Sequence, residues 1–325
     1  MPVIVNSEEI HPFLPSLGSP EAIERDRAER QDIRTLEFAV INIMADKQAT
    51  ERQLARCLGN SPLQVKLTFA APDGYVRDIR AGRESRNTPS EHIRKFYCAW
   101  NEIKDQKFDG LVVTGVNALK DRVEDEDIWP DMQNILAWSQ TNVLSSLFLC
   151  WGAQAALKHF HDIDSLRGER KLFGLFEHHL GHDRAGLLAG FPDIFPIPVS
   201  RWKSPTREAI QQRQMLEIIG DSPETGPNII AETAPYGSGR ACYPKRIYIL
   251  NHPEYDTDTL KQEYARDHSK DPNWPLPHHY FPGDDPTREP LNRWRHTAQI
   301  YTNWVHAVYE ATPYELANIP NPLAK

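Results

Sequence analysis

Four strand-length apolar runs alternate with segments of helical period, and this alternation constrains the fold more than any other feature of the sequence. The runs lie at residues 36–44, 63–69, 111–115 and 144–150. A segment with helical spacing follows each of them, at residues 46–60, 91–103, 129–140 and 151–160. Runs without polar alternation, such as LVVTG, are typical of strands that helices cover on both faces. The sequence therefore predicts an α/β fold with a doubly wound, mainly parallel sheet flanked by helices.

The second half of the chain is rich in proline and carries weaker signals. One clear strand is predicted at Arg246–Leu250, and a final helix with an aromatic face at Arg293–Ala311. Because proline has no N–H to donate, we expect loops at its clusters, residues 191–202, 221–228 and 272–290. We expect one α/β domain over residues 35–325, with a loop-rich C-terminal portion, and an N-terminal arm over residues 1–34.

Composition and charge argue against several classes of protein. The 325 residues include 37 Lys and Arg against 45 Asp and Glu, which gives a net charge of −8. Because the sequence has no run of basic residues, neither nucleic acid nor a membrane is expected as partner. We therefore expect small-molecule substrates. The first residues lack the features of a signal peptide, which favours a cytoplasmic protein. The 4 cysteines are far apart and form no Cys-x-x-Cys pair, so neither a disulfide framework nor a zinc site is expected.

Cys150 lies where the apolar run LFLC passes directly into a helix of small residues, WGAQAAL. A sharp strand-to-helix turn of this kind exposes a nucleophile, as in the elbow of serine hydrolases. The start of the helix stabilises a thiolate, and the Trp151 N–H can point at a developing oxyanion. Gly152 lets the helix approach the sheet closely. The alternative for Cys150 is a buried cysteine that only ends a core strand.

A second strand ends about a hundred residues later in Asn251-His252-Pro253-Glu254. Residues two apart in an extended chain lie on the same side, and the tips of parallel strands form the ligand crevice of such sheets. A nucleophile at one tip and a base with its orienting carboxylate at another suit covalent acyl chemistry. We therefore predict a catalytic triad of Cys150, His252 and Glu254.

The pattern Cys-x-Gly-x-Gln followed by His-Pro-Glu resembles the class I glutamine amidotransferases, which use such a triad on a flavodoxin-like fold. A closer resemblance extends over roughly residues 35–318. It is to the homoserine O-acyltransferase family, the homoserine O-succinyl- and O-acetyltransferases of methionine biosynthesis. Three blocks that carry it, Arg83–Pro89, Glu177–His179 and Phe281–Pro286, are not amidotransferase features.

This resemblance implies roles for particular residues. Cys150 would accept the acyl group from acyl-CoA as co-substrate, His252 would act as general base with Glu254, and no cofactor would stay bound. Lys171 and Ser200 would hold the amino acid, and Arg266 its carboxylate. Arginine suits that role because its guanidinium forms a bidentate fork. The second oxyanion N–H would lie near Gly115 or Val116.

The sequence departs from the family at several positions. Leu119 stands where the family has Gly or Glu, and its bulk favours acetyl over succinyl, whereas neighbouring Lys120 could pair with a succinyl carboxylate. The continuation RWKSPTREAIQQRQ after Ser200 is unusual for the family, and Asn251 replaces the usual Gly before His-Pro-Glu. Serine therefore stays open as an acceptor beside homoserine, since one methylene contributes only about 1–3 kcal/mol to discrimination.

Alternative interpretations fit parts of the sequence. An amidotransferase-type cysteine hydrolase would keep the triad but pass the acyl group to water or ammonia. A metal site at His178, His179 and His182 is not expected, because adjacent histidines on a strand point to opposite sides. The aromatic face of the last helix fits a homodimer interface, although core packing is favoured.

Overall fold

The computed structural model describes residues 3–5, 22–24, 34–235 and 242–319. Most of the predicted N-terminal arm lies outside the described residues. Within it, strands β1 (Val3–Val5) and β2 (Ala22–Glu24) pair in parallel as a two-stranded sheet of their own.

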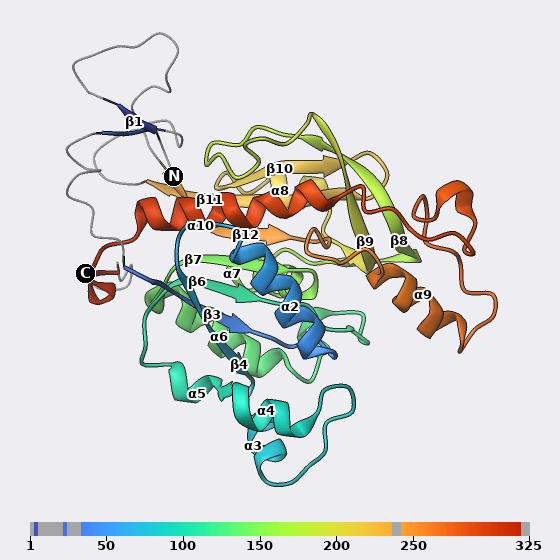
Figure 1. Ribbon diagram of the computed structural model, residues 1–325, viewed down its shortest axis with the longest axis horizontal. Coiled ribbons are helices and arrows are strands. Elements are labelled where there is room, and N and C mark those ends of the chain that lie inside the picture. The colour runs from blue at the N-terminus through green and yellow to red at the C-terminus, as the bar shows by residue number, and fades with distance from the viewer. Residues whose placement is uncertain (1–2, 6–21, 25–33, 236–241, 320–325) are drawn as a thin grey trace.

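All other strands form one ten-stranded sheet in the order β5-β4-β3-β6-β7-β12-β11-β10-β8-β9 (Figure 1). The parallel half contains β3 (Leu36–Ile41), β4 (Val65–Ala71), β5 (Cys98–Ala99), β6 (Phe108–Val113), β7 (Val143–Leu149) and β12 (Cys242–Ile249). The antiparallel half contains β8 (Leu166–Leu180), β9 (Ile194–Ser204), β10 (Leu216–Ser222) and β11 (Gly226–Pro235). The predicted α/β class is confirmed, and the parallel half corresponds to the alternating segments of the sequence.

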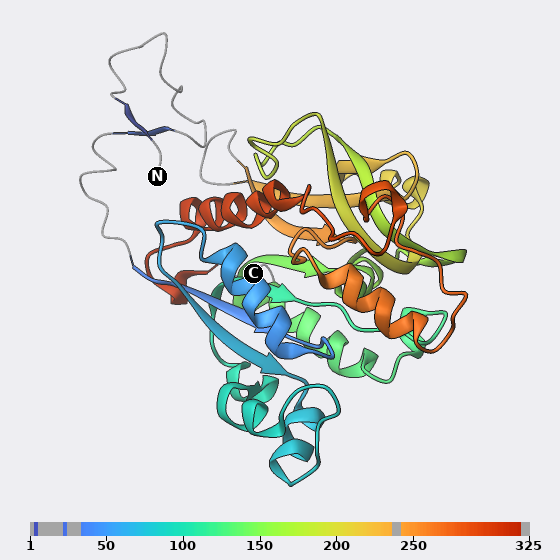
Figure 2. The ribbon, with the colours of Figure 1, turned by 45° about the vertical axis from the view of Figure 1, so that its right-hand side comes forward.

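Helices cover both faces of this sheet. They are α2 (Lys47–Leu58), α3 (Asp73–Arg80), α4 (Ser90–Phe96), α5 (Trp100–Ile103), α6 (Trp129–Asn142), α7 (Trp151–His161), α8 (Arg207–Gln211), α9 (Thr259–His268) and α10 (Gln299–Ala311). Short 3-10 turns lie at Val123–Asp125, Pro282–Asp284, Arg295–Ala298 and Leu316–Asn318. In Figures 1 and 2, α2 and α10 lie side by side over one face, and α6 and α7 cover the other.

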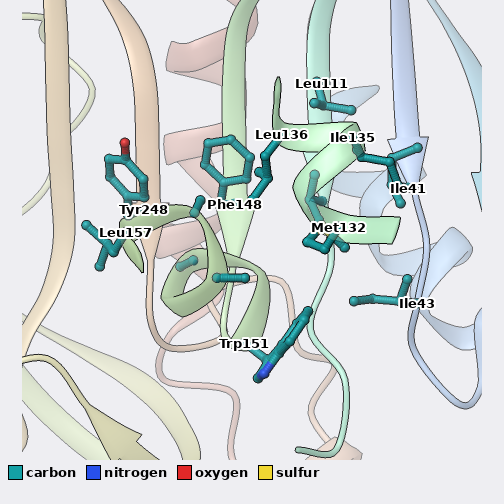
Figure 3. Close-up of a cluster of buried hydrophobic side chains, with 14 of the residues drawn as sticks. Ile41, Ile43, Leu111, Met132, Ile135, Leu136, Phe148, Trp151, Leu157 and Tyr248 are labelled. Atoms are coloured by element: carbon teal, nitrogen blue, oxygen red, sulfur yellow. The ribbon is translucent and has the colours of Figure 1, made fainter. Parts of the chain in front are cut away.

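Two apolar clusters correspond to these two faces. One joins α2 and α10 to Phe38 and Val40 of β3, and the other joins α6 and α7 to Ala39 and Ile41 of the same strand. Figure 3 shows the second cluster around Trp151 and Met132. Successive residues of β3 thus enter opposite cores, which explains why its sequence lacks polar alternation. Trp304 of α10 is fully buried, so the aromatic face of this helix packs into the core.

Four expectations for the elements were wrong. The proline cluster at residues 221–228, expected as a loop, is mostly strand, because it contains the end of β10 and the start of β11. The proline cluster at residues 191–202 contributes most of strand β9, because β9 is the edge of the sheet, where a missing N–H is tolerated. The helix expected at 91–103 is broken into α4, β5 and α5. The last helix begins as a 3-10 turn at Arg295 and becomes α-helical at Gln299.

None of the helices in the described part of the chain combines the length and apolar character that a bilayer crossing requires.

Gly152 fixes how closely α7 approaches the sheet. A methyl group at this residue would lie 2.7 Å from the Thr114 carbonyl oxygen and 2.9 Å from that of Val113, both at the end of β6. These backbone atoms cannot rotate away, so the first turn of α7 requires a glycine. The close approach expected from the sequence is confirmed.

Gly152→Ala is predicted to lower the free energy of unfolding by about 1–3 kcal/mol, the usual cost of overpacking. Urea denaturation followed by circular dichroism measures this free energy of unfolding. Gly74→Ala in α3 is the matched control, because its new methyl group would meet only an Arg77 side-chain nitrogen at 3.8 Å. Equal stability of the Gly152→Ala variant and the unaltered protein would contradict this account of the packing.

Candidate active site

Cys150 occupies the turn between β7 and α7 and has the unusual backbone angles φ 50° and ψ −115°. Its N–H donates to the Ile249 carbonyl at 2.7 Å, and its own carbonyl accepts from Ala153 and Gln154 at 3.1 Å each. A positive φ at a residue other than glycine is strained and needs a surrounding structure that holds it. The turn leaves the side chain half-buried at the first turn of α7, as expected of an elbow.

His252 and Glu254 follow the end of β12, the strand that pairs with β7. Both are buried, and His252 Nδ1 lies 2.7 Å from Glu254 Oε1. The second oxygen of Glu254 accepts from the Tyr301 hydroxyl of α10 at 3.1 Å, and Arg56 donates to the Glu254 carbonyl at 2.8 Å. His252 and Tyr301 thus each contact one carboxylate oxygen of Glu254, Arg56 fixes its backbone, and the carboxylate orients the imidazole.

The charge on His252 is set by its two neighbours. Burial alone would lower its pKa, but the Glu254 carboxylate and the Cys150 sulfur, both hydrogen-bonded to His252, raise the pKa to about 10. The imidazole therefore holds a proton at neutral pH when the thiol is ionised. Tyr255 stacks on the ring with the centroids 4.1 Å apart and 17° between the planes. The structure thus brings the three residues of the predicted triad together.

The predicted oxyanion residues divide into two groups. Gly115 is close to the nucleophile, because a methyl group there would lie 3.0 Å from Cys150 Cβ and 3.5 Å from the Trp151 nitrogen. Trp151 is buried, and Val116 is half-buried against the same core cluster. Leu119, in contrast, is 77% exposed, so it does not pack into an acyl pocket in this structure.

A second polar group lies on the far side of Tyr255. The Tyr255 hydroxyl donates to Glu263 Oε1 at 2.7 Å, and the Ser200 hydroxyl donates to Glu263 Oε2 at 2.6 Å. Lys171 Nζ is 3.5 Å from the same Oε2. Lys171 and Ser200 are therefore close together, although one comes from β8 and the other from β9. The carboxylate that joins them, Glu263 of α9, was not identified from the sequence.

Arg266 lies one turn further along α9. Its guanidinium donates to Asp267 at 2.8 and 2.9 Å, and its side chain is 55% exposed. The Asp267 hydrogen bond and the carboxylates of Asp267 and Glu263 raise the Arg266 pKa despite partial burial. Arg266 is thus near the group around Glu263 but makes no direct hydrogen bond with Lys171 or Ser200.

Two buried cations lie on the inward face of β9. The sequence did not identify either of them as a site residue. Arg201 and Lys203 are 3% and 2% exposed, and burial lowers the pKa of both, an effect that a negative charge on Cys150 opposes. Lys203 Nζ donates to the Lys120 carbonyl at 2.5 Å. Arg201 and Lys203 were missed because the sequence predicted a loop at the proline cluster 191–202, and a loop has no face that points regularly inward.

The two histidines of β8 differ in their surroundings. His178 is buried between the Phe176 carbonyl and the Asn251 amide, at 3.0 Å from each. His179 points to the other side of the strand. Across the described ranges, no three His, Cys, Asp or Glu side chains gather as metal ligands would.

Comparisons with known proteins show the family and the fold of this chain. The homoserine O-succinyltransferase family model matches residues 17–314. A homoserine O-acetyltransferase of Chelativorans sp. (strain BNC1) is 42% identical, over 91% of this chain and 90% of that protein. A homoserine O-succinyltransferase of Pelagibacterium halotolerans is 39% identical, over 91% of each chain. A solved structure from Thermoplasma acidophilum, described as part of a GMP synthase, superimposes with a TM-score of 0.51 at 12% identity. It covers 86% of this chain and 96% of its own, and it supports the amidotransferase-like fold.

Iodoacetamide at neutral pH is predicted to label Cys150 at least about tenfold faster than Cys57 or Cys98. Burial raises the pKa of Cys57 to about 12 and also raises that of Cys98, so neither forms much thiolate. Peptide mass spectrometry over a time course measures the rates, with Cys150→Ser as control. Labelling of Cys57 as fast as Cys150 would argue against an activated thiol.

Proposed function

Because this chain belongs to the homoserine O-succinyltransferase family and is an acyltransferase, we propose that it transfers an acyl group from acyl-CoA to homoserine through a thioester on Cys150. One observation carries this proposal. Cys150 faces a His252–Glu254 pair, and Tyr255 links that pair to the polar group of Lys171, Ser200 and Glu263. A nucleophile thus adjoins a site with both a cation and an anion, which suits an amino acid acceptor.

The first half-reaction forms the acyl-enzyme. The Cys150 thiolate attacks the thioester carbonyl, and the oxyanion accepts hydrogen bonds from the Trp151 N–H and an N–H near Gly115. The bond from the carbonyl carbon to the CoA sulfur then breaks. The departing thiolate takes the proton from the His252 imidazolium, which leaves a neutral imidazole held by Glu254.

The second half-reaction transfers the acyl group. Neutral His252 takes the proton of the homoserine side-chain hydroxyl while its oxygen attacks the thioester on Cys150. The carbon–sulfur bond breaks, the thiolate returns, and the imidazolium again pairs with it. We assign the α-carboxylate of the acceptor to Lys171 and Arg266, and its α-ammonium to Glu263, because those charges complement it.

We propose acetyl-CoA as the donor, supported by the name of the 42% identical relative. Succinyl-CoA is the second candidate. Two buried cations near Cys150, Arg201 and Lys203, suit the free carboxylate of a succinyl group, and the exposed Leu119 does not narrow the site. L-Serine is the alternative acceptor.

A matrix of acetyl-CoA and succinyl-CoA against homoserine and serine, with CoA release as readout, tests the function. We expect the highest kcat/KM for acetyl-CoA with homoserine, and no release by Cys150→Ala. Highest activity with succinyl-CoA would overturn the donor assignment. Glutaminase activity without any use of acyl-CoA would overturn the function itself.

Glu263→Gln is predicted to raise the KM for homoserine about tenfold or more, because a hydrogen bond to a charged group contributes about 1.5–3 kcal/mol. The rate of CoA release in the first half-reaction should stay within about twofold, since Glu263 does not touch the triad. Steady-state kinetics give the KM for homoserine, and single-turnover kinetics give the rate of CoA release. Glu289→Gln, whose carboxylate pairs only with exposed Lys261, is the control. An unchanged KM would contradict the assignment of the ammonium.

A further inference from the structure

Tyr255 contacts the catalytic base with its ring and the acceptor site with its hydroxyl. The ring stacks on the imidazole of His252, with the centroids 4.1 Å apart and 17° between the planes. The hydroxyl donates to Glu263 Oε1 at 2.7 Å. One side chain therefore lies between the residue that deprotonates the acceptor hydroxyl and the residue to which we assign the acceptor ammonium.

The backbone and the ring of Tyr255 are both held in place. Its N–H donates to the His252 carbonyl at 3.3 Å, and its carbonyl accepts from the indole N–H of Trp294 at 3.0 Å. Trp294 is fully buried, and Tyr255 packs with it in an apolar cluster that includes Phe173 and Leu260. Because packing is close on all of these sides, the phenol cannot turn without displacing the imidazole or this cluster.

The Tyr255 hydroxyl fixes one oxygen of the Glu263 carboxylate. Burial and the nearby carboxylates raise the pKa of Tyr255 well above its ordinary value, so the hydroxyl keeps the proton that it donates. The other oxygen, Oε2, accepts from the Ser200 hydroxyl at 2.6 Å. Two hydroxyls on two different segments thus fix the plane of the carboxylate, and without Tyr255 its Oε1 loses this anchor.

These contacts constrain the length of the acceptor. His252 Nδ1 faces Glu254 Oε1, so Nε2 is the nitrogen left to take the proton of the acceptor hydroxyl. An acceptor with its ammonium on Glu263 must bring its hydroxyl to that nitrogen. The spacing between the two ends is set by an aromatic ring, which is rigid apart from two side-chain torsions.

We propose that Tyr255 is a positioning residue that holds Glu263 at a fixed spacing from His252, and that this spacing selects homoserine over serine. The inference rests on the proposed function and on its assignment of the acceptor ammonium to Glu263. Serine is one methylene shorter than homoserine, so it cannot reach both ends at once. An apolar pocket alone discriminates weakly against a missing methylene, and a fixed spacing adds to that discrimination.

The test compares Tyr255→Phe, which keeps the stacked ring but loses the hydroxyl, with Tyr255→Leu, which loses both. Tyr264→Phe is the matched control, because this tyrosine packs on the same cluster and its hydroxyl bonds His268 rather than Glu263. Single-turnover CoA release without acceptor, from acetyl-CoA or succinyl-CoA, whichever the unaltered protein uses, measures the first half-reaction. Steady-state kinetics with homoserine and with serine measure the acceptor preference, and thermal denaturation reports whether each variant is folded.

For Tyr255→Phe we expect CoA release within about twofold of the unaltered protein and a KM for homoserine about tenfold higher. The kinetics with serine should change little, so the preference for homoserine falls by about the same factor. Tyr255→Leu should slow CoA release as well, because His252 loses its stacking partner, and Tyr264→Phe should change none of these quantities. If the leucine variant does not fold, the phenylalanine variant still decides.

An unchanged KM for homoserine or an unchanged preference over serine in Tyr255→Phe would overturn the proposal. So would a tenfold slower CoA release in that variant, because the hydroxyl would then act on the triad rather than on the acceptor. The two claims fail differently. No CoA release by the unaltered protein would overturn the proposed function and this inference with it, whereas normal release with unaltered acceptor kinetics in Tyr255→Phe would overturn this inference alone.

Discussion

The parallel pairing of β7 with β12 is the constraint on which the site depends. Leu149 lies opposite Ile249, so the two strands end at the same level, and the Cys150 N–H extends the ladder by donating to Ile249. About a hundred residues separate these strands in the sequence. Since Cys150 and His252 each lie within three residues of those ends, their distance is set by backbone hydrogen bonds rather than by a flexible loop.

Strand β9 supplies the rest of the site by presenting different residues on its two faces. Ser200 faces Glu263 on one side, whereas Arg201 faces the region of Cys150 on the other. The Pro198 carbonyl accepts the N–H of His252 at 3.0 Å, at the edge of β9 that no other strand covers. An edge strand thus acts as a support for the catalytic histidine. Its prolines keep its outer edge from pairing further.

The sequence was sufficient for the parallel half of the fold apart from β5, and for the residues of the triad, because these depend on local patterns. LFLCWG predicts an elbow from its own composition, and NHPE predicts a strand end. It was insufficient for β8 to β11, whose pairing is long-range, and the prolines of β9 and β11 resemble those of a loop. Glu263, Tyr301 and Arg201 were missed for the same reason. Each acts through a contact with a distant segment, and nothing in its neighbours along the chain signals that contact.

In the proposed mechanism Cys150 carries the acyl group between donor and acceptor, and every other assignment in the site follows from that role. Its most direct test is mass spectrometry of the intact protein mixed with acyl-CoA in the absence of acceptor, followed by peptide mapping. We expect the mass of one acyl group per chain, located on Cys150, absent from Cys150→Ala and lost when homoserine is added. An unmodified Cys150 in a protein that still acylates homoserine would contradict this role.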